Sequence, residues 1–390
     1  MAAHYTTHCI FANKKRNPAV EFSVNRSDLL KELNFLQGVV EKKSTIPIIQ
    51  NLLIRAKKGE PLTLVATDLE STLRCLCPAQ VKVGGTILLP ARKLYDLVRS
   101  LPDAEITVKT DGNDQAIVTC ERSRFKLLSP DPEAFPPLAN VPDSQFSVPA
   151  SILRAMIPRT LFASTQEESR FALNGAQVIL SPSTLRVVAT DGHRLAFIEK
   201  SGVEFKAPKE SIKLLIPKKT LAEVQKLAGD ADDEIIKFGK DDNHIFFEIG
   251  NRLYISRMLA GQFPNYEMVM PKANDKALII ESDRLAATLR RVAYMADDVT
   301  HAIKINITEG QIEFSAQSSG SGEGFDALPV PYDGDTYSLA FNVQYLLDFL
   351  SVVNVGEISF EFRDEATQIQ LRPHGESDYN YRYVVMPMRN

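Results

Sequence analysis

The sequence has few cysteines and no long apolar run. Four cysteines in 390 residues are too few for a disulfide framework in so long a chain, which favours reduced thiols and a cytoplasmic protein. No window approaches the run of about 18 apolar residues that a transmembrane helix needs. The first residues lack the apolar segment of a secretory signal. These absences argue against a secreted protein and against a membrane protein.

The common motifs of catalytic sites are also absent. There is no GxxxxGKS/T phosphate loop, no GxGxxG after a strand, no HExxH and no GxSxG. Asp191-Gly-His-Arg194 is the candidate for acid–base chemistry, but no nucleophile accompanies it, and a turn between two strands is the favoured interpretation. An enzyme that uses Asp191 and His193 stays open as an alternative. Cys75-Leu-Cys77 lacks a second pair of metal ligands. We therefore expect no catalytic residue, no metal and no cofactor.

What the sequence does contain is an internal repeat with a period of about 125 residues. Three landmarks recur at this spacing, and solenoid repeats are far shorter, at about 20 to 50 residues. The period is therefore that of a domain, and the chain is predicted to hold three copies of it. The landmarks are Phe22-Ser-Val, Phe146-Ser-Val and Ile279-Ile-Glu, each before a helix; Leu88-Leu-Pro, Leu215-Ile-Pro and Ala340-Phe-Asn; and Val65-Ala-Thr-Asp68, Val188-Ala-Thr-Asp191 and Phe314-Ser-Ala-Gln317.

Proline-rich joints near residues 130–142 and 264–271 mark the boundaries between the copies. Residues 1–20 are expected to be a disordered basic extension, followed by domains at 21–141, 142–271 and 272–390. Alternating apolar stretches predict several antiparallel strands in each copy, which gives an α+β fold. Asn25 or Ser27, Ser151 and Ser282 occupy the positions expected for helix N-caps. Two helices are predicted in each copy, at 27–36, 92–100, 151–161, 218–227, 283–295 and 343–350.

The net charge of −4 argues on its face against a nucleic-acid partner. The distribution of charge argues the other way, because five of the six predicted helices are net basic or neutral. Basic helices on an otherwise acidic body indicate one electropositive surface that faces a polyanion. A monomeric nucleic-acid-binding scaffold of three domains is therefore a second alternative.

Two stretches resemble the signatures of one protein family. Val188-Ala-Thr-Asp-Gly-His-Arg-Leu-Ala196 and Tyr383-Val-Val-Met-Pro-Met-Arg389 are similar to those of the bacterial DNA polymerase III beta subunit, the beta sliding clamp. The resemblance runs from about Glu21 to Asn390. Supporting matches are Thr45-Ile-Pro-Ile, Ala66-Thr-Asp-Leu-Glu70, Pro90-Ala-Arg-Lys93, Phe171-Ala-Leu-Asn-Gly175, Gly261-Gln-Phe-Pro-Asn-Tyr266 and Phe341-Asn-Val-Gln-Tyr345.

The resemblance implies a head-to-tail homodimer whose six DNA-clamp domains form a ring around duplex DNA and confer processivity on a polymerase. Domain size agrees, since three touching domains would leave a hole of only about 5 Å and six a hole of about 35 Å. The expected partners are double-stranded DNA without sequence preference, the replicative polymerase catalytic subunit, clamp loader subunits, other polymerases and mismatch-repair proteins. The proteins are expected to bind through short linear peptides.

The resemblance also implies site residues. Met268 and Ala172 depart from the residues that relatives often carry, so the groove for peptides is expected to be less polar and more open here. The groove positions are Leu173, Thr190, Gly192, His193, Arg194, Leu195, Pro264, Val269, Asn342, Tyr345, Val385, Met386, Pro387, Met388 and Arg389. Candidates for DNA contact are Lys42, Lys43, Arg92, Lys93, Lys218 and Lys219; candidates for the dimer contact are Phe125 and Leu127 against Tyr294 and Met295.

Overall fold

The computed structural model describes residues 19–41, 45–110, 114–165, 167–202, 208–229, 234–320 and 322–388. These residues divide into two compact units. Unit 1 runs to Val141 and includes Asn251–Ile255; unit 2 comprises Pro142–Gly250 and Ser256–Asn390. Most of the predicted N-terminal extension lies outside the described residues. Val20, the last residue of the predicted extension, is buried, and its backbone exchanges hydrogen bonds with Thr110 of 2.8 and 3.0 Å. Val20 therefore packs with the folded part of unit 1.

The helices lie where the repeat predicts them, and each of the six predicted helices begins directly after a strand. Over the described residues they are α1 (Arg26–Leu36), α2 (Ala91–Ser100), α3 (Ala150–Met156), α4 (Pro158–Leu161), α5 (Lys218–Ala228), α6 (Ser282–Ala293) and α7 (Val343–Val353), with 3-10 turns η1 (Pro47–Gln50), η2 (Pro132–Ala134), η3 (Glu168–Leu173) and η4 (Tyr266–Met268).

Two details of the helix prediction are wrong. The single helix expected at 151–161 is divided into α3 and α4, because Pro158 has no N–H to continue the ladder of α3. Ser151 and Ser282 lie inside their helices rather than at N-caps, which are Pro149 and Glu281. The Ser282 hydroxyl instead donates to the carbonyl oxygen of Gly356, at 3.2 Å.

Unit 1 contains two antiparallel sheets and the adjacent helices α1 and α2. Cys75 and Cys77 are both buried on one face of β4, as their spacing predicts. Glu32 of α1 forms a buried pair with Arg252 at 2.7 and 2.8 Å. One sheet has the order β5 (Gln80–Val83), β1 (Glu21–Asn25), β7 (Glu105–Thr110), β8 (Gln115–Cys120), β9 (Ser123–Leu128); the other contains β4 (Ser71–Cys77), β3 (Leu62–Thr67), β2 (Asn51–Ala56) and β6 (Gly85–Pro90).

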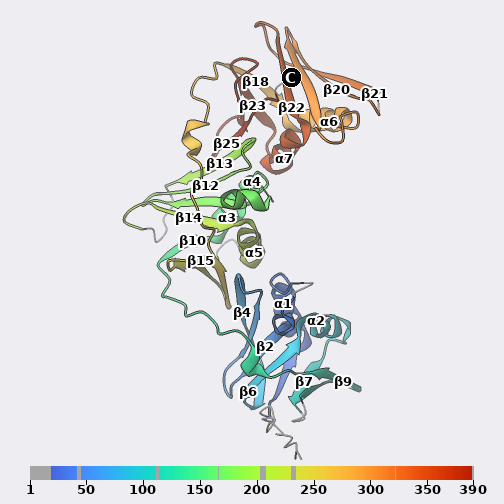
Figure 1. The fold of residues 1–390 in the computed structure, drawn as a ribbon, viewed down its shortest axis with the longest axis vertical. Coiled ribbons are helices and arrows are strands. Elements are labelled where there is room, and N and C mark those ends of the chain that lie inside the picture. Colours follow the sequence, from blue (N-terminus) through green and yellow to red (C-terminus); the bar gives the residue numbers. More distant parts are fainter. Residues whose placement is uncertain are drawn as a thin grey trace, which may run out of the picture. The chain divides into compact units, whose positions relative to one another are not determined.

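Unit 2 holds the remaining sheets, and α6 and α7 lie side by side in its C-terminal half (Figure 1). One sheet has the order β14 (Ile212–Pro217), β11 (Gly175–Leu180), β12 (Thr184–Thr190), β13 (Arg194–Ser201), β25 (Asn380–Val385), β24 (Ile369–Pro373), β23 (Glu357–Phe362), β18 (Lys276–Glu281). A second has the order β21 (Gly322–Pro329), β20 (Gln311–Ser318), β19 (Ala302–Thr308), β22 (Tyr337–Asn342). The other strands are β10 (Phe146–Pro149), β15 (Ile235–Lys240) and β16 (His244–Ile249), with β17 (Arg252–Arg257) running on from unit 1.

The strand order confirms the threefold repeat. The order β1-β7-β8 recurs as β10-β15-β16 and as β18-β23-β24, and β6-β2-β3-β4 recurs as β14-β11-β12-β13 and as β22-β19-β20-β21. Within unit 2, neighbouring domains join where β13 pairs antiparallel with β25, from Arg194 opposite Val385 to Glu199 opposite Asn380. The joint therefore pairs β13, the strand that ends the order β14-β11-β12-β13 in the second domain, with β25, the strand that ends the order β18-β23-β24-β25 in the third domain.

No helix in the described part of the chain combines the length and the apolar character needed to cross a bilayer.

Candidate functional site

The stretch that sequence analysis singled out, Asp191 to Arg194, is a tight turn between β12 and β13. One carboxylate oxygen of Asp191 accepts hydrogen bonds from the backbone N–H groups of His193 and Arg194, at 2.9 and 3.0 Å. Gly192 has φ of +91°, a conformation that a residue with a Cβ adopts only under strain. The Thr190 hydroxyl donates to the carbonyl oxygen of Arg194 at 2.6 Å. These bonds fix the turn and aim the Arg194 side chain.

Arg194 is the centre of a polar network between the second and third domains. Its Nε donates to the other Asp191 oxygen at 3.0 Å, and a terminal nitrogen donates to the carbonyl oxygen of Phe162 at 2.8 Å. The other terminal nitrogen pairs with Asp348 on α7. The guanidinium lies over the ring of Tyr345, 4.4 Å from its centre. Since the side chain is only 10% exposed, Arg194 is used inside the protein and holds β13 against α7.

The charge of Arg194 is secured by its surroundings. Burial alone would lower the pKa of its guanidinium, but the Tyr383 hydroxyl and the Asp348 and Asp191 carboxylates raise that pKa above its ordinary value. Arg194 therefore stays charged at every physiological pH. The Asp191 and Asp348 carboxylates therefore already pair with the charge of Arg194, one of the predicted groove positions.

The C-terminal segment after β25 crosses from the second domain to the third. The Met386 N–H donates to the carbonyl oxygen of His193 at 2.9 Å, and the Met388 N–H donates to that of Ala340 at 2.8 Å. Met386 is 42% exposed, whereas Pro387 and Met388 are half-buried. Two backbone anchors thus hold three apolar side chains at the surface, beside the Arg194 network.

Other apolar side chains are exposed on η3 and at the end of η4. Met268 is 78% exposed and Val269 41%, at the end of η4. Phe171 is 55% exposed on η3; it lies in one of the stretches that resemble the family but is not among the predicted groove positions. Ala172 adjoins Gly261, where an added Cβ would lie 3.6 Å from the Ala172 Cβ. Soluble proteins rarely gather exposed Met and Phe side chains without a use for them.

The predicted groove positions differ in exposure. Tyr345 is half-buried, and its carbonyl oxygen accepts a hydrogen bond from the Tyr383 hydroxyl at 2.9 Å. The Asn342 side chain accepts from the Gln344 N–H at 2.9 Å and so caps α7. Arg389 lies outside the described residues. Of the rest, Thr190, Leu195 and Val385 are buried; Leu173 is half-buried; and Gly192, His193 and Pro264 are exposed. Thr190, Leu195 and Val385 therefore lie beneath the surface.

An acid–base pair is not formed at the turn. Both Asp191 oxygens bind the backbone and Arg194, and no hydrogen bond among the described residues joins the Asp191 carboxylate to the His193 imidazole. The described residues also hold no group of three or more His, Cys, Asp or Glu side chains that could bind a metal ion.

The DNA-contact candidates that fall within the described residues lie at the starts of helices. Arg92 and Lys93 are exposed in the first turn of α2, and Lys219 is exposed in the first turn of α5. Lys218 is half-buried; burial, together with the nearby charge of Arg194, lowers its pKa. Lys42 and Lys43 lie outside the described residues.

The dimer-contact candidates lie at two sheet edges. Phe125 is 38% exposed on β9, an outermost strand of its sheet. Leu127 is half-buried on the same strand. Tyr294 is 81% exposed just after α6. Met295 packs beneath Gly324 of β21, the outermost strand of another sheet, where an added Cβ would meet its side chain at 2.9 Å.

Comparison with known proteins decides the family. Residues 20–139, 147–265 and 267–389 match the N-terminal, central and C-terminal domains of the DNA polymerase III beta subunit. The chain belongs to this family. It is a DNA sliding clamp, the processivity factor of replication, and it has three clamp domains with antiparallel sheets and few helices.

Individual relatives agree over their full length. The beta sliding clamp of Pseudomonas putida is 34% identical over 376 residues, which cover 95% of this chain and 100% of the relative. That of Caulobacter vibrioides is 33% identical over 381 residues, with the same coverage. Among solved structures, the Pseudomonas aeruginosa clamp has a TM-score of 0.88 at 32% identity, covering 95% of this chain and 100% of that one. A C. crescentus clamp has a TM-score of 0.89 at 32% identity, covering 96% and 100%.

Proposed function

We propose that two copies of the chain close head to tail into a ring of six domains around duplex DNA. The observation that carries the proposal is a pair of outermost strands, β9 in the first domain and β21 in the third. In the repeat they correspond to β25 and β13, which pair with each other inside unit 2. Pairing β21 with β9 of a second chain repeats that joint, and a head-to-tail contact that closes after two copies makes a ring.

The side chains at the two edges favour this pairing. Phe125 is partly exposed on β9, and Tyr294 is largely exposed beside β21, so each edge has apolar surface to bury. The two strands also differ in charge. β9 carries Arg124 and Lys126, whereas β21 carries Glu323 and Asp326. Opposite charges across an interface steer association and disfavour contact between like edges.

We infer that different partner proteins bind this ring in turn and that the chain performs no catalysis of its own. The proposed domains are those of the repeat, with boundaries near residues 141 and 271. The apolar surface around Met386 to Met388 is proposed to bind short linear peptides that contain Gln and Leu or Phe, a mode that suits flexible Met side chains. The proposed partners are the replicative polymerase, the clamp loader, other polymerases and mismatch-repair proteins, and the proposed location is the cytoplasm, where bacterial DNA is replicated.

Retention on circular DNA tests the ring. A clamp placed on a nicked plasmid by a bacterial clamp loader should elute with the plasmid in gel filtration. It should be released when a restriction enzyme cuts the circle once, because a ring slides off an end. A monomeric scaffold that binds the surface of DNA would be retained equally by the circular and by the linear plasmid. That result would exclude encirclement.

DNA contact is expected to be diffuse. Changing Arg92, Lys93, Lys218 or Lys219 singly to alanine should weaken DNA binding by less than about 1 kcal/mol, since solvent-separated contacts to phosphate are weak. The four changes together should flatten the dependence of binding on salt. Lys57→Ala with Lys58→Ala, on the exposed loop between β2 and β3, is the control for lost charge. Fluorescence anisotropy on duplexes of unrelated sequence provides the measurement, and strong sequence preference would contradict the proposal.

A further inference from the structure

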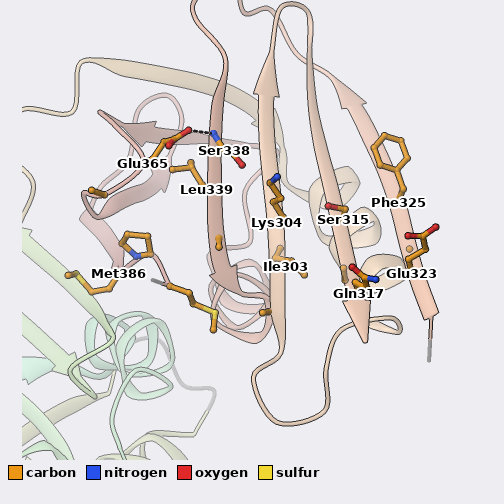
Figure 2. Close-up of a pocket in the computed structure, with 17 residues that line it drawn as sticks. Ile303, Lys304, Ser315, Gln317, Glu323, Phe325, Ser338, Leu339, Glu365 and Met386 are labelled. Atoms are coloured by element: carbon orange, nitrogen blue, oxygen red, sulfur yellow. Dashed lines mark hydrogen bonds between the residues drawn. The ribbon is translucent and has the colours of Figure 1, made fainter. Parts of the chain in front are cut away.

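The third domain has a hollow that extends beyond the proposed peptide groove, over residues that no site above uses. Its volume is about 1200 Å³, and it lies over the sheet β21-β20-β19-β22, with Met386, Pro387 and Met388 along one side (Figure 2). Across the strands the sheet register places Phe325, Ser315, Lys304 and Ala340 in one row. Small side chains beside Lys304 leave room for an extended backbone to approach the sheet.

The hollow is on the face of the sheet that faces away from α6. Gly324 contacts Met295 at the end of α6, and Phe314 and Ile305 are fully buried. Since side chains alternate along a strand, Lys304, Ser315 and Phe325 point to the opposite face, as Figure 2 shows for their sticks. Phe325 is 66% exposed there.

The hollow is continuous with the proposed peptide groove, because both use the same C-terminal segment. Met386 is held to His193 and Met388 to Ala340 by backbone hydrogen bonds. A bound peptide that continues past the methionines therefore reaches the row of residues around Lys304.

The charged side chains that line the hollow indicate which residues a peptide would carry where it continues past the methionines. Among the described residues that line it, Lys304 is the one Lys or Arg, and no ion pair within the described chain involves it. Glu365 accepts a hydrogen bond from the Ser338 N–H at 2.8 Å, which fixes its carboxylate at the β22 side of the hollow. Glu323 lies on β21, where the proposed ring brings the basic strand β9. Lys304 is thus the one cation that the described lining offers to a ligand, and it attracts an anionic group.

We propose that this hollow binds an acidic segment that flanks the partner's peptide motif, with a carboxylate of that segment paired to Lys304. The inference rests on the proposed groove and adds to it a preference for the partner's flanking sequence. The acidic segment would bind through a charge-assisted hydrogen bond at a partly open site, which contributes modestly to affinity. The peptide motif should therefore provide most of the affinity, and the flanking segment should modulate it.

The test compares peptides that share one Gln- and Leu/Phe-containing motif. One is the motif alone; others carry four added residues rich in Asp and Glu, or four rich in Lys, at either end. On the unaltered protein, one of the acidic extensions should tighten binding about fivefold in fluorescence anisotropy at low salt, and the basic extension at that end should not. Lys304→Glu should abolish this gain while the motif alone binds unchanged.

Arg284→Glu is the matched control, because it makes the same change of charge on α6, where the side chain is 63% exposed and the hollow is on the far side of the sheet. It should keep the full gain, and thermal unfolding should show that both variants fold. An acidic extension that gains nothing at either end, or a gain that survives Lys304→Glu, would overturn the inference and leave the groove standing. Failure of the motif alone to bind would overturn the groove and the inference together.

Discussion

Phe125→Asp combined with Leu127→Asp is expected to convert the dimer into monomers. Both side chains are on the face of β9 that adjoins the buried Val118 and Ala116, and Phe125 is partly exposed because its sheet ends there. In the proposed ring they pack against Tyr294 and its neighbours, so each aspartate would be buried without a partner. An unpaired buried carboxylate costs several kcal/mol, and each ring has two such contacts. Sedimentation at micromolar concentration should show monomers.

Two further variants separate loss of the contact from loss of the fold. Tyr294→Asp alters the opposite side of the contact at a residue that is 81% exposed, so it should weaken the dimer without unfolding the third domain. Val81→Asp with Val83→Asp makes the same chemical change on β5, the other outermost strand of that sheet, and should leave the dimer intact. A dimer that survives both Phe125→Asp with Leu127→Asp and Tyr294→Asp would place the interface elsewhere.

The repeat made much of this fold predictable from the sequence. Strand-to-helix junctions were expected near Asn25, Pro90, Pro149, Pro217, Glu281 and Asn342, and the structure has a helix at each. The caps were predicted less well, because a serine near a strand end can find another acceptor, as Ser282 does at Gly356. Capping propensity depends only on neighbouring residues, whereas the acceptor of the Ser282 hydroxyl lies 74 residues away in the sequence.

The site was predictable only in part, for a related reason. Arg194, Tyr345 and the methionines were named from the family resemblance, but Asp348 and Phe162 were not. A lone aspartate on an apolar helix gives no signal of its own, and it reaches Arg194 because β13 pairs with β25 across about 190 residues of chain. We therefore expect Arg194 to support the proposed groove from within the protein rather than to contact the end of a peptide.

Deleting Met386 to Asn390, or changing Leu173 to Asp, is expected to abolish binding of a short polymerase peptide that contains Gln and Leu or Phe. The deletion removes both backbone anchors of the C-terminal segment, at His193 and Ala340, together with its apolar side chains. A few apolar anchors dominate affinity in such grooves, so the expected loss exceeds about 100-fold. Isothermal calorimetry with the peptide provides the measurement.

The dimer should survive both changes, because neither alters a residue of β9, β21 or α6, which form the proposed contact. Val299→Asp is the matched control: Val299 is 86% exposed in the third domain, so it makes the same apolar-to-acid change without touching the C-terminal segment, and it should leave peptide binding unchanged. Sedimentation and thermal unfolding on the same samples distinguish a lost groove from a lost fold. Peptide binding that persists in both variants, or that disappears only when the protein unfolds, would show that Met386 to Met388 merely complete the third domain.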